Sequence, residues 1–423
     1  MKKEFFESPI GESYVKAVHS SGLTVYIMEK PQYTSAYAVF GTKYGSIDTK
    51  FSKNGGETVE VPEGIAHFLE HKLFESEDGD AFTRFAKTGA YANAFTSFDR
   101  TCYLFSCSDK FYDNLAILLD FVQSPYFTEQ TVSKEQGIIG QEIKMYDDSP
   151  AWRVMFNMLT CMYHNHPVKI DIAGTVESIA KIDASLLYKC YETFYNPSNM
   201  FICIAGNVDT EKVLKQIEGG IINNAPVTIE RGEFNEPEEI VKPFVKQSLA
   251  VSMPMFCFGY KQRIKTPDRS LKTKVCMQLL LELICGDASP LYARLVKDGL
   301  INDEFETEYF NGHGYATVIF EGESSNPERV AELIKEEVER IKSDGIDKKL
   351  FSAVKCSMYG DAIRRFNNVE EIAMQLIECA MCDYDLFEEL KLLKTVTSDD
   401  VLRRLEFLDN ENTVLSVISP KEG

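Results

Sequence analysis

Hydrophobic and polar positions recur along this chain with two different periods, and each period predicts its own kind of element. Apolar residues at helical spacing over 64–74, just after Pro62, predict a buried helix. Alternation over 94–98 and again over 101–105 predicts two strands that pair as a β-hairpin about residues 99–100. Strands and helices are therefore mixed within the first part of the chain, as in an α+β fold.

The same order of elements occurs twice, which predicts two copies of one α+β unit. Each half opens with strands, passes to a helix and returns through a strand to further helices. A polar, proline-punctuated segment separates the halves and is typical of a linker. The expected division is an N-terminal domain over 1–228, a linker over 229–246 and a C-terminal domain over 247–423.

Composition and charge narrow the class of protein. A chain of 423 residues that is 44% hydrophobic and 26% charged is an ordinary globular protein, large enough for about two to three domains. The net charge of −20 argues against a nucleic-acid partner. It would favour basic or neutral peptides if it lined a binding site, and simple solubility is the alternative. The N-terminus does not resemble an export signal and no run approaches a membrane span, so we expect a cytoplasmic protein with no membrane partner.

Residues 67–71, His-Phe-Leu-Glu-His, place two imidazoles and a carboxylate on one side of the predicted helix. At 3.6 residues per turn, His67 and His71 lie about 40° apart around the helix axis, and Glu70 lies within about 60° of His67. This order presents two nitrogen ligands for Zn²⁺ and a carboxylate that can act as a general base. The alternative is a pair of ordinary core histidines, but three such groups buried together would be costly to desolvate without a cation.

A catalytic zinc site uses three protein ligands, so another element should carry one more His, Asp or Glu. Glu142 is the best candidate, because it lies in a helical stretch over 131–146. Glu135 lies two turns earlier on the same face and could orient the site as a supporting carboxylate. Taken alone, two glutamates on a charged helix more often form a solvated face, but the motif at 67–71 favours the metal site.

Several segments together resemble one known family. They are the motif 67–71, the pair Glu135 and Glu142, the run 89–97 (Gly-Ala-Tyr-Ala-Asn-Ala-Phe-Thr-Ser), and the stretches 120–127, 174–177 and 195–208. The chain resembles the pitrilysin/insulinase family of inverted-motif (HxxEH) zinc peptidases, which includes the mitochondrial processing peptidases. Within that family it resembles a half-length bacterial branch, the YmfH-like or AlbF-like proteins.

The resemblance implies a fold and a division of roles. The implied fold is α+β, with two homologous domains, each a mainly antiparallel sheet packed with helices, that form a half-clamshell like that of the mitochondrial processing peptidases. The implied zinc ligands are His67, His71 and Glu142. Glu70 is then the catalytic general base, and Glu135 is a supporting carboxylate that does not bind the ion itself. The C-terminal domain has no H-x-x-E-H and is expected to have no zinc site.

The resemblance also implies where a peptide binds. The family holds an extended peptide by adding it to the edge strand of a sheet, with backbone hydrogen bonds for affinity and pockets for selectivity. The matching substrate-binding residues here are Asn93, Ala94, Phe95 and Thr96. The sequence pattern alone also allows an ordinary core strand at this position.

One departure from the family pattern concerns the substrate carbonyl. Active half-length relatives carry an Arg and a Tyr in the C-terminal region that bind this carbonyl. Val296 and Asn302 fall where that pair is expected. Arg294, together with Tyr309 or Tyr315, could supply the same function from a shifted position, and the sequence leaves this open.

The sequence therefore predicts a zinc metalloendopeptidase subunit with Zn²⁺ as its cofactor and peptides as its substrates. Because the Arg and Tyr are missing, the expected active form is a heterodimer with a half-length relative that supplies them, and a homodimer is the alternative. The rival function is a non-catalytic peptide-binding or scaffold subunit of a processing complex. The complete set His67, Glu70, His71 and Glu142 argues against that rival, since inactive members usually lose ligands.

Overall fold

The computed structural model describes residues 1–77, 79–263 and 267–421, and it divides into two compact units. The first unit consists of Met1–Ile143, Asp171–Gly232 and Arg364–Phe387. The second consists of Lys144–Ile170, Glu233–Ile363 and Glu388–Gly423. Each unit thus gathers three separate segments of the chain.

The core of the first unit is a seven-stranded sheet in the order β1-β2-β3-β11-β4-β10-β9. Neighbouring strands are antiparallel except β3 and β11, which run parallel. Every residue of β4 and β11 is buried, as expected for strands that are covered on both faces. The strands are β1 Lys2–Glu7, β2 Ser13–Val18, β3 Thr24–Glu29, β4 Ala36–Thr42, β9 Tyr91–Thr96, β10 Thr101–Cys107 and β11 Met200–Gly206.

Helices and two small sheets complete the first unit. Helices α1 and α3 contact β10, whereas α13 contacts β3, β4 and β11. The small sheets pair β5 Lys50–Lys53 with β6 Val59–Glu60 and β12 Ile229–Arg231, and β7 Glu75–Ser76 with β8 Gly79–Asp80. The helices are α1 Ile65–Leu73, α2 Ala81–Thr88, α3 Phe111–Val122, α4 Glu129–Asp147 (which ends in the second unit), α6 Val176–Ile179, α7 Ala184–Phe194, α8 Thr210–Gly220 and α13 Val369–Cys382.

The second unit is built around a five-stranded sheet in the order β13-β17-β14-β16-β15. Again one neighbouring pair, β13 and β17, is parallel and the others are antiparallel. The strands are β13 Phe244–Leu249, β14 Met255–Lys261, β15 Glu306–Gly312, β16 Tyr315–Glu323 and β17 Thr413–Pro420. The helices are α5 Pro150–Met162, α9 Leu271–Cys285, α10 Pro290–Lys297, α11 Pro327–Asp344, α12 Lys348–Arg364, α14 Glu388–Thr395 and α15 Ser398–Leu402.

The predicted α+β class, with two units of mainly antiparallel sheet and helices, is confirmed. The helix predicted over 64–74 is α1, and the hairpin predicted about residues 99–100 is formed by β9 and β10, in which Thr96 pairs with Thr101. Pro62 and Gly64 precede α1 as the sequence pattern indicated. Local periodicity therefore located the elements that carry the candidate site.

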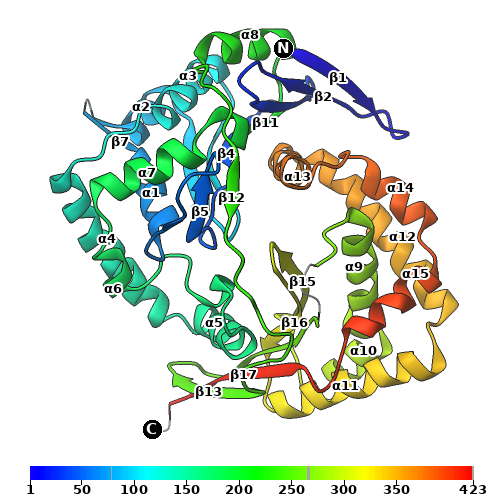
Figure 1. Ribbon diagram of the computed structural model, residues 1–423. Helices are drawn as coiled ribbons and strands as arrows, with labels where there is room; N and C mark the ends of the chain where they lie inside the picture. Colours follow the sequence, from blue (N-terminus) through cyan, green and yellow to red (C-terminus); the bar gives the residue numbers. More distant parts are fainter. Residues whose placement is uncertain (78, 264–266, 422–423) are drawn as a thin grey trace. The chain divides into compact units, whose positions relative to one another are not determined.

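The compact units differ from the predicted division into 1–228, a linker over 229–246 and 247–423. The helix α13, drawn in orange in Figure 1, belongs to the first unit although its sequence lies near the C-terminus. The helix α5 lies in the N-terminal half of the sequence but contacts β13, β14 and β17 of the second unit. The predicted linker also contains β12, which pairs with β5 in the first unit. Each of the two helices, α13 and α5, therefore packs its apolar face on a sheet whose strands come mainly from the other half of the sequence.

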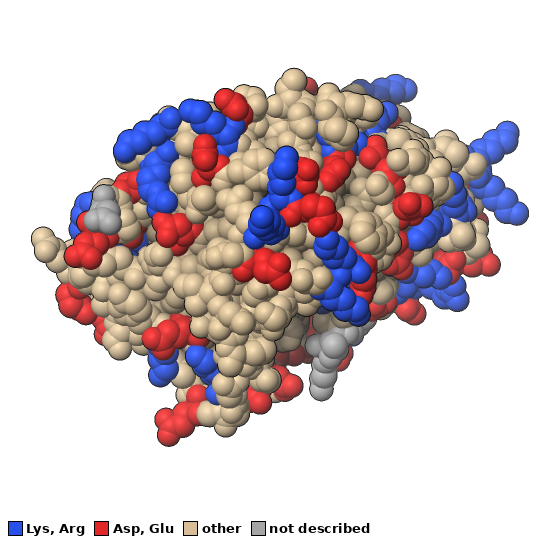
Figure 2. Space-filling view, turned by 90° about the horizontal axis from the view of Figure 1, so that it is seen from above, with Lys and Arg blue, Asp and Glu red and all other residues tan. Residues whose placement is uncertain are grey.

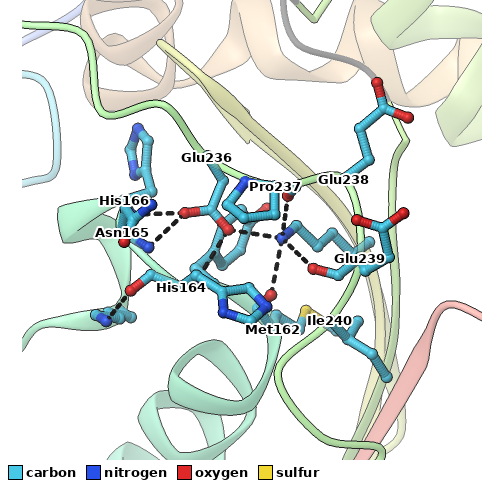
Figure 3. Close-up of polar contacts among 12 residues, drawn as sticks. Met162, His164, Asn165, His166, Glu236, Pro237, Glu238, Glu239 and Ile240 are labelled. Carbon is cyan, nitrogen blue, oxygen red and sulfur yellow. Dashed lines mark hydrogen bonds and ion pairs between the residues drawn. The ribbon is translucent and has the colours of Figure 1, made fainter.

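A buried ion pair fixes the segment that enters the second unit after Gly232. The Glu236 carboxylate lies 2.7 Å from Lys261 Nζ, and the two side chains are only 11% and 3% exposed. Figure 3 shows how backbone groups surround this pair. Glu236 accepts hydrogen bonds from the backbone N–H groups of His164, Asn165 and His166, and Lys261 donates toward the carbonyl oxygens of Met162, Pro237 and Glu239.

Replacing Lys261 by methionine is expected to destabilise the second unit by about 3–5 kcal/mol, because a buried carboxylate then loses its counter-ion. Urea denaturation of the variant measures this loss, and Lys246→Met, at an exposed position of β13, is the matched control. Burial alone would raise the pKa of Glu236, but Lys261 and the backbone N–H groups outweigh it and hold this pKa below its ordinary value. The carboxylate therefore contributes stability above about pH 4.3 and loses it as the pH falls through the folded-state pKa. A Lys261→Met protein as stable as the Lys246→Met protein at neutral pH would contradict this account.

Charged side chains of both signs are mixed over the face seen in Figure 2. The net charge of −20 therefore does not gather into a single patch on that face. Among the residues that the structure describes, there is no helix with the length and apolar character needed to span a bilayer.

Candidate metal centre and peptide-binding edge

Helix α1 presents both histidines and the glutamate of the motif from one element. Gly64 precedes the helix with φ of +85°, and a Cβ atom there would lie 2.3 Å from the carbonyl oxygen of Ala173, so glycine is required at this entry. One and two turns further on, the rings of His67 and His71 lie edge to face with centroids 4.6 Å apart. Glu70 is 8% exposed, as is His67. The predicted placement on one buried side of a helix is therefore found.

Helix α4 brings the two predicted glutamates to the same place. Glu142 Oε1 lies 3.8 Å from His67 Nε2, and Glu142 Oε2 lies 3.5 Å from His71 Nε2. Glu135, two turns earlier on α4, has its Oε1 3.1 Å from His71 Nδ1. The two elements are about 70 residues apart in the sequence, so the fold brings together ligands that no local pattern links.

The three side chains His67, His71 and Glu142 can hold one metal ion, since one ligand atom from each lies within 4.8 Å of the others. Four ligands around a tetrahedral zinc ion with bonds of about 2.1 Å lie about 3.4 Å from one another. The observed separations of 3.5 and 3.8 Å are close to that value and too long for direct hydrogen bonds. Two imidazoles and one carboxylate are also a donor set that zinc accepts.

The surroundings of the two histidines shift their pKa values in opposite directions. Burial, with a smaller effect from the neighbouring His71, lowers the pKa of His67 to about 3, so this imidazole is neutral and has a lone pair for a metal. For His71, burial alone would lower the pKa, but the hydrogen bond to Glu135 and the nearby carboxylates outweigh it and raise the pKa. Glu135 thus orients the ring that it contacts. Nδ1 of His67 is buried and has no hydrogen-bond partner among the described residues, so packing alone sets the orientation of that ring.

Glu70 lies beside the donor set and is held by a residue of the edge strand. Thr96 Oγ1 donates a hydrogen bond of 2.6 Å to Glu70 Oε2. Burial raises the pKa of Glu70 to about 6, although the Thr96 hydrogen bond acts in the opposite direction. A carboxylate with a pKa near neutrality is suited to accept a proton and return it.

The strand β9 forms one edge of the seven-stranded sheet, as the family resemblance implied. It carries Asn93, Ala94, Phe95 and Thr96, and it pairs with β10 alone among the described residues. The alternative of a strand enclosed within the sheet is thereby excluded. An edge strand of this kind is where an extended peptide can be added to a sheet.

The C-terminal residues considered as carbonyl ligands lie in the second unit. Val296 is 46% exposed on α10, and Asn302 donates a hydrogen bond of 2.9 Å to Glu323. Arg294 lies 3.6 Å from Asp298 in an exposed ion pair. The two tyrosines considered as its partners are both buried, with Tyr309 7% and Tyr315 4% exposed.

Sequence analysis missed a buried charge next to the motif. Lys72 directly follows His71 and is fully buried, and its ammonium group pairs with Glu75. The signal was present, because a lysine followed by a glutamate at i,i+3 is a common helical pair. Its burial could not be inferred from the pattern, since lysines are rarely buried.

Comparisons with known proteins show the family of this chain. Residues 54–176 match the profile of "Insulinase (Peptidase family M16)", and residues 181–358 match "Peptidase M16 inactive domain". The "Uncharacterized zinc protease YmfH" of Bacillus subtilis (strain 168) is 44% identical over 389 residues, which cover 90% of each chain. The "Putative zinc protease AlbF" of Bacillus subtilis is 28% identical over 216 residues, 51% of this chain and 50% of that protein.

Solved structures show the same fold. A "putative M16-like peptidase from Alicyclobacillus acidocaldarius" aligns with a TM-score of 0.94 and 33% identity over 98% of this chain and 100% of that chain. Pitrilysin shares the fold at 16% identity and a TM-score of 0.78, and all of this chain covers 47% of it. The chain therefore belongs to the insulinase family, peptidase family M16, and matches its half-length YmfH-like members.

Proposed function

We propose that this chain is a zinc-dependent metalloendopeptidase subunit that hydrolyses peptide bonds. The observation that carries the proposal is the convergence of His67, His71 and Glu142 from α1 and α4, with the Glu70 carboxylate beside them. The nitrogen and oxygen donors suit zinc, and the relatives YmfH and AlbF are named zinc proteases.

Each residue of the site then has a separate task. His67, His71 and Glu142 hold the ion, and Glu135 orients His71 through its Nδ1 atom. Zinc bound there polarises a carbonyl group and lowers the pKa of a water molecule. Glu70 accepts the proton of the attacking water and delivers it to the leaving amine.

The edge strand β9 supplies the peptide-binding surface in this proposal. An extended peptide adds to the outer side of Asn93, Ala94, Phe95 and Thr96 through backbone hydrogen bonds. Such binding places the peptide next to Glu70, because Thr96 is in direct contact with that carboxylate.

A partner completes the active site in this proposal. Val296 and Asn302 stand where the Arg and Tyr of active half-length relatives are expected. A half-length relative that supplies Arg and Tyr forms the heterodimer, and a homodimer is the second arrangement to test. The same replacement supports the alternative function, a non-catalytic peptide-binding or scaffold subunit.

Peptide hydrolysis by the purified, zinc-loaded chain tests the function directly. A mixed peptide library is digested with the chain alone, with a half-length relative that carries the Arg and Tyr alone, with both chains together, and with both chains after chelation. We expect fast cleavage only when both chains and zinc are present. Cleavage by the relative alone at the same rate would assign the catalysis to that protein, and this chain would then be the scaffold subunit.

Replacing Glu135 by glutamine tests its supporting role. We expect zinc affinity or peptide turnover to fall by about 10–100-fold without loss of the fold, because the charged contact to His71 is weakened. Metal titration and turnover measure the effect, and Glu129→Gln, at an exposed position in the first turn of α4, is the matched control. Wild-type values for Glu135→Gln in both assays would show that Glu135 does not support the site.

A further inference from the structure

The hydroxyl group of Thr96 connects the edge strand to the candidate base. Thr96 is the last residue of β9, and its Oγ1 lies 2.6 Å from Glu70 Oε2. An ionised carboxylate only accepts hydrogen bonds, so Thr96 is the donor in this contact. No hydrogen bond to Glu70 Oε1 is formed by the described residues. One carboxylate oxygen is therefore held and the other is left for proton transfer.

Thr101 on β10 lies next to Thr96 and donates its own proton elsewhere. Its Oγ1 lies 3.3 Å from Thr96 Oγ1 and donates a 2.9 Å hydrogen bond to the carbonyl oxygen of Tyr44. That carbonyl can only accept, so the proton of Thr101 is committed to Tyr44. The single proton of Thr96 goes to Glu70, because that contact is shorter, 2.6 Å against 3.3 Å to Thr101, and its acceptor is charged. Thr96 pairs in register with Thr101, which fixes the side chain on the α1 side of the sheet.

We infer that Thr96 is a positioning residue through which the peptide-binding strand β9 holds the Glu70 carboxylate in the orientation needed for proton transfer. The inference rests on the proposed peptidase function. Its physical basis is that a charge-assisted hydrogen bond at 2.6 Å fixes the carboxylate rotamer, which would otherwise depend on packing alone. Since Thr96 belongs to the strand that accepts the peptide, docking of the peptide and orientation of the base use the same residue.

Thr96→Val and Thr96→Ser separate the hydroxyl from the size of the side chain. We expect Thr96→Val to lower kcat by about 10–100-fold with KM nearly unchanged, because a misoriented base slows proton transfer. Thr96→Ser keeps the hydroxyl and should restore most of kcat. Zinc content should remain at the wild-type level in both variants, since Thr96 contacts no proposed ligand in the described structure.

The matched control is Thr42→Val. Thr42 is buried in the same sheet, and its hydroxyl donates a 2.6 Å hydrogen bond to the carbonyl oxygen of Phe194. This variant also loses a hydroxyl that donates a short hydrogen bond, so it should lower stability while leaving kcat at the wild-type value. Wild-type kcat for Thr96→Val, or a raised KM with unchanged kcat, would overturn the positioning role.

A second readout does not require catalysis. A double-mutant cycle between Thr96→Val and Glu70→Ala is measured by urea denaturation, and we expect the two changes to be non-additive because each removes the same contact. If no assay detects peptide hydrolysis, the proposed function is wrong. Non-additive effects on stability would still support the hydrogen bond by which Thr96 positions Glu70. Additive effects in the cycle would overturn the inference even in an active enzyme.

Discussion

Glu70→Gln is expected to lower peptide turnover by about 10²–10⁴-fold while the protein keeps its zinc. The reason is the separation of roles in the site: Glu70 lies beside the donor atoms but is not one of the three that converge. Removing the general base takes away the contribution that proton transfer makes to the rate. Glutamine has the shape of glutamate, so the hydrogen bond from Thr96 retains an acceptor.

His67→Ala is the informative comparison for this variant. It removes one of three donors, so zinc should be lost together with activity. Elemental analysis and turnover, measured on the same preparations, distinguish the two variants. A folded Glu70→Gln protein without zinc would show that Glu70 is a ligand and that the roles are assigned incorrectly.

The metal centre could be predicted because three of its residues lie within one short stretch of the sequence. The spacing of His67, Glu70 and His71 fixes their common side of a helix, and the need for a third ligand directed attention to Glu142. The hydrogen bond from Thr96 to Glu70 could not be predicted in the same way. It depends on how the β9–β10 hairpin packs against α1, and strand alternation gives the face of a side chain but not its contact in another element.

The packing of α13 and α5 could not be predicted from the sequence for the same reason. The apolar positions of α13 show that one of its faces is buried, and a linker at 229–246 then suggests burial in the C-terminal half. Its buried residues instead cover β3, β4 and β11 of the first unit. An amphipathic pattern specifies that a face is covered and leaves open which surface covers it.

Ile377→Asp should therefore damage the metal centre, although residue 377 lies more than 200 positions after Glu142. Ile377 is fully buried on α13, and a carboxylate placed there would lie against the sheet that supports α1 and β9. Burying an unpaired charge ranks among the most destabilising substitutions, with losses above about 4 kcal/mol. We expect the variant to lose zinc and to show fast hydrogen exchange in α1 and β10.

Two controls distinguish this outcome from general damage. Met374→Asp changes a position of the same helix that is 38% exposed, and it should retain zinc. Leu333→Asp places a charge at an equally buried position of α11 in the second unit, and it should disturb exchange there before it disturbs α1. The division at 229–246 would instead place residue 377 in the core of the C-terminal domain. In that case Ile377→Asp would behave like Leu333→Asp, and the amides of α1 would still exchange slowly. Retention of zinc and of slow exchange in α1 by Ile377→Asp would contradict the placement of α13 in the first unit.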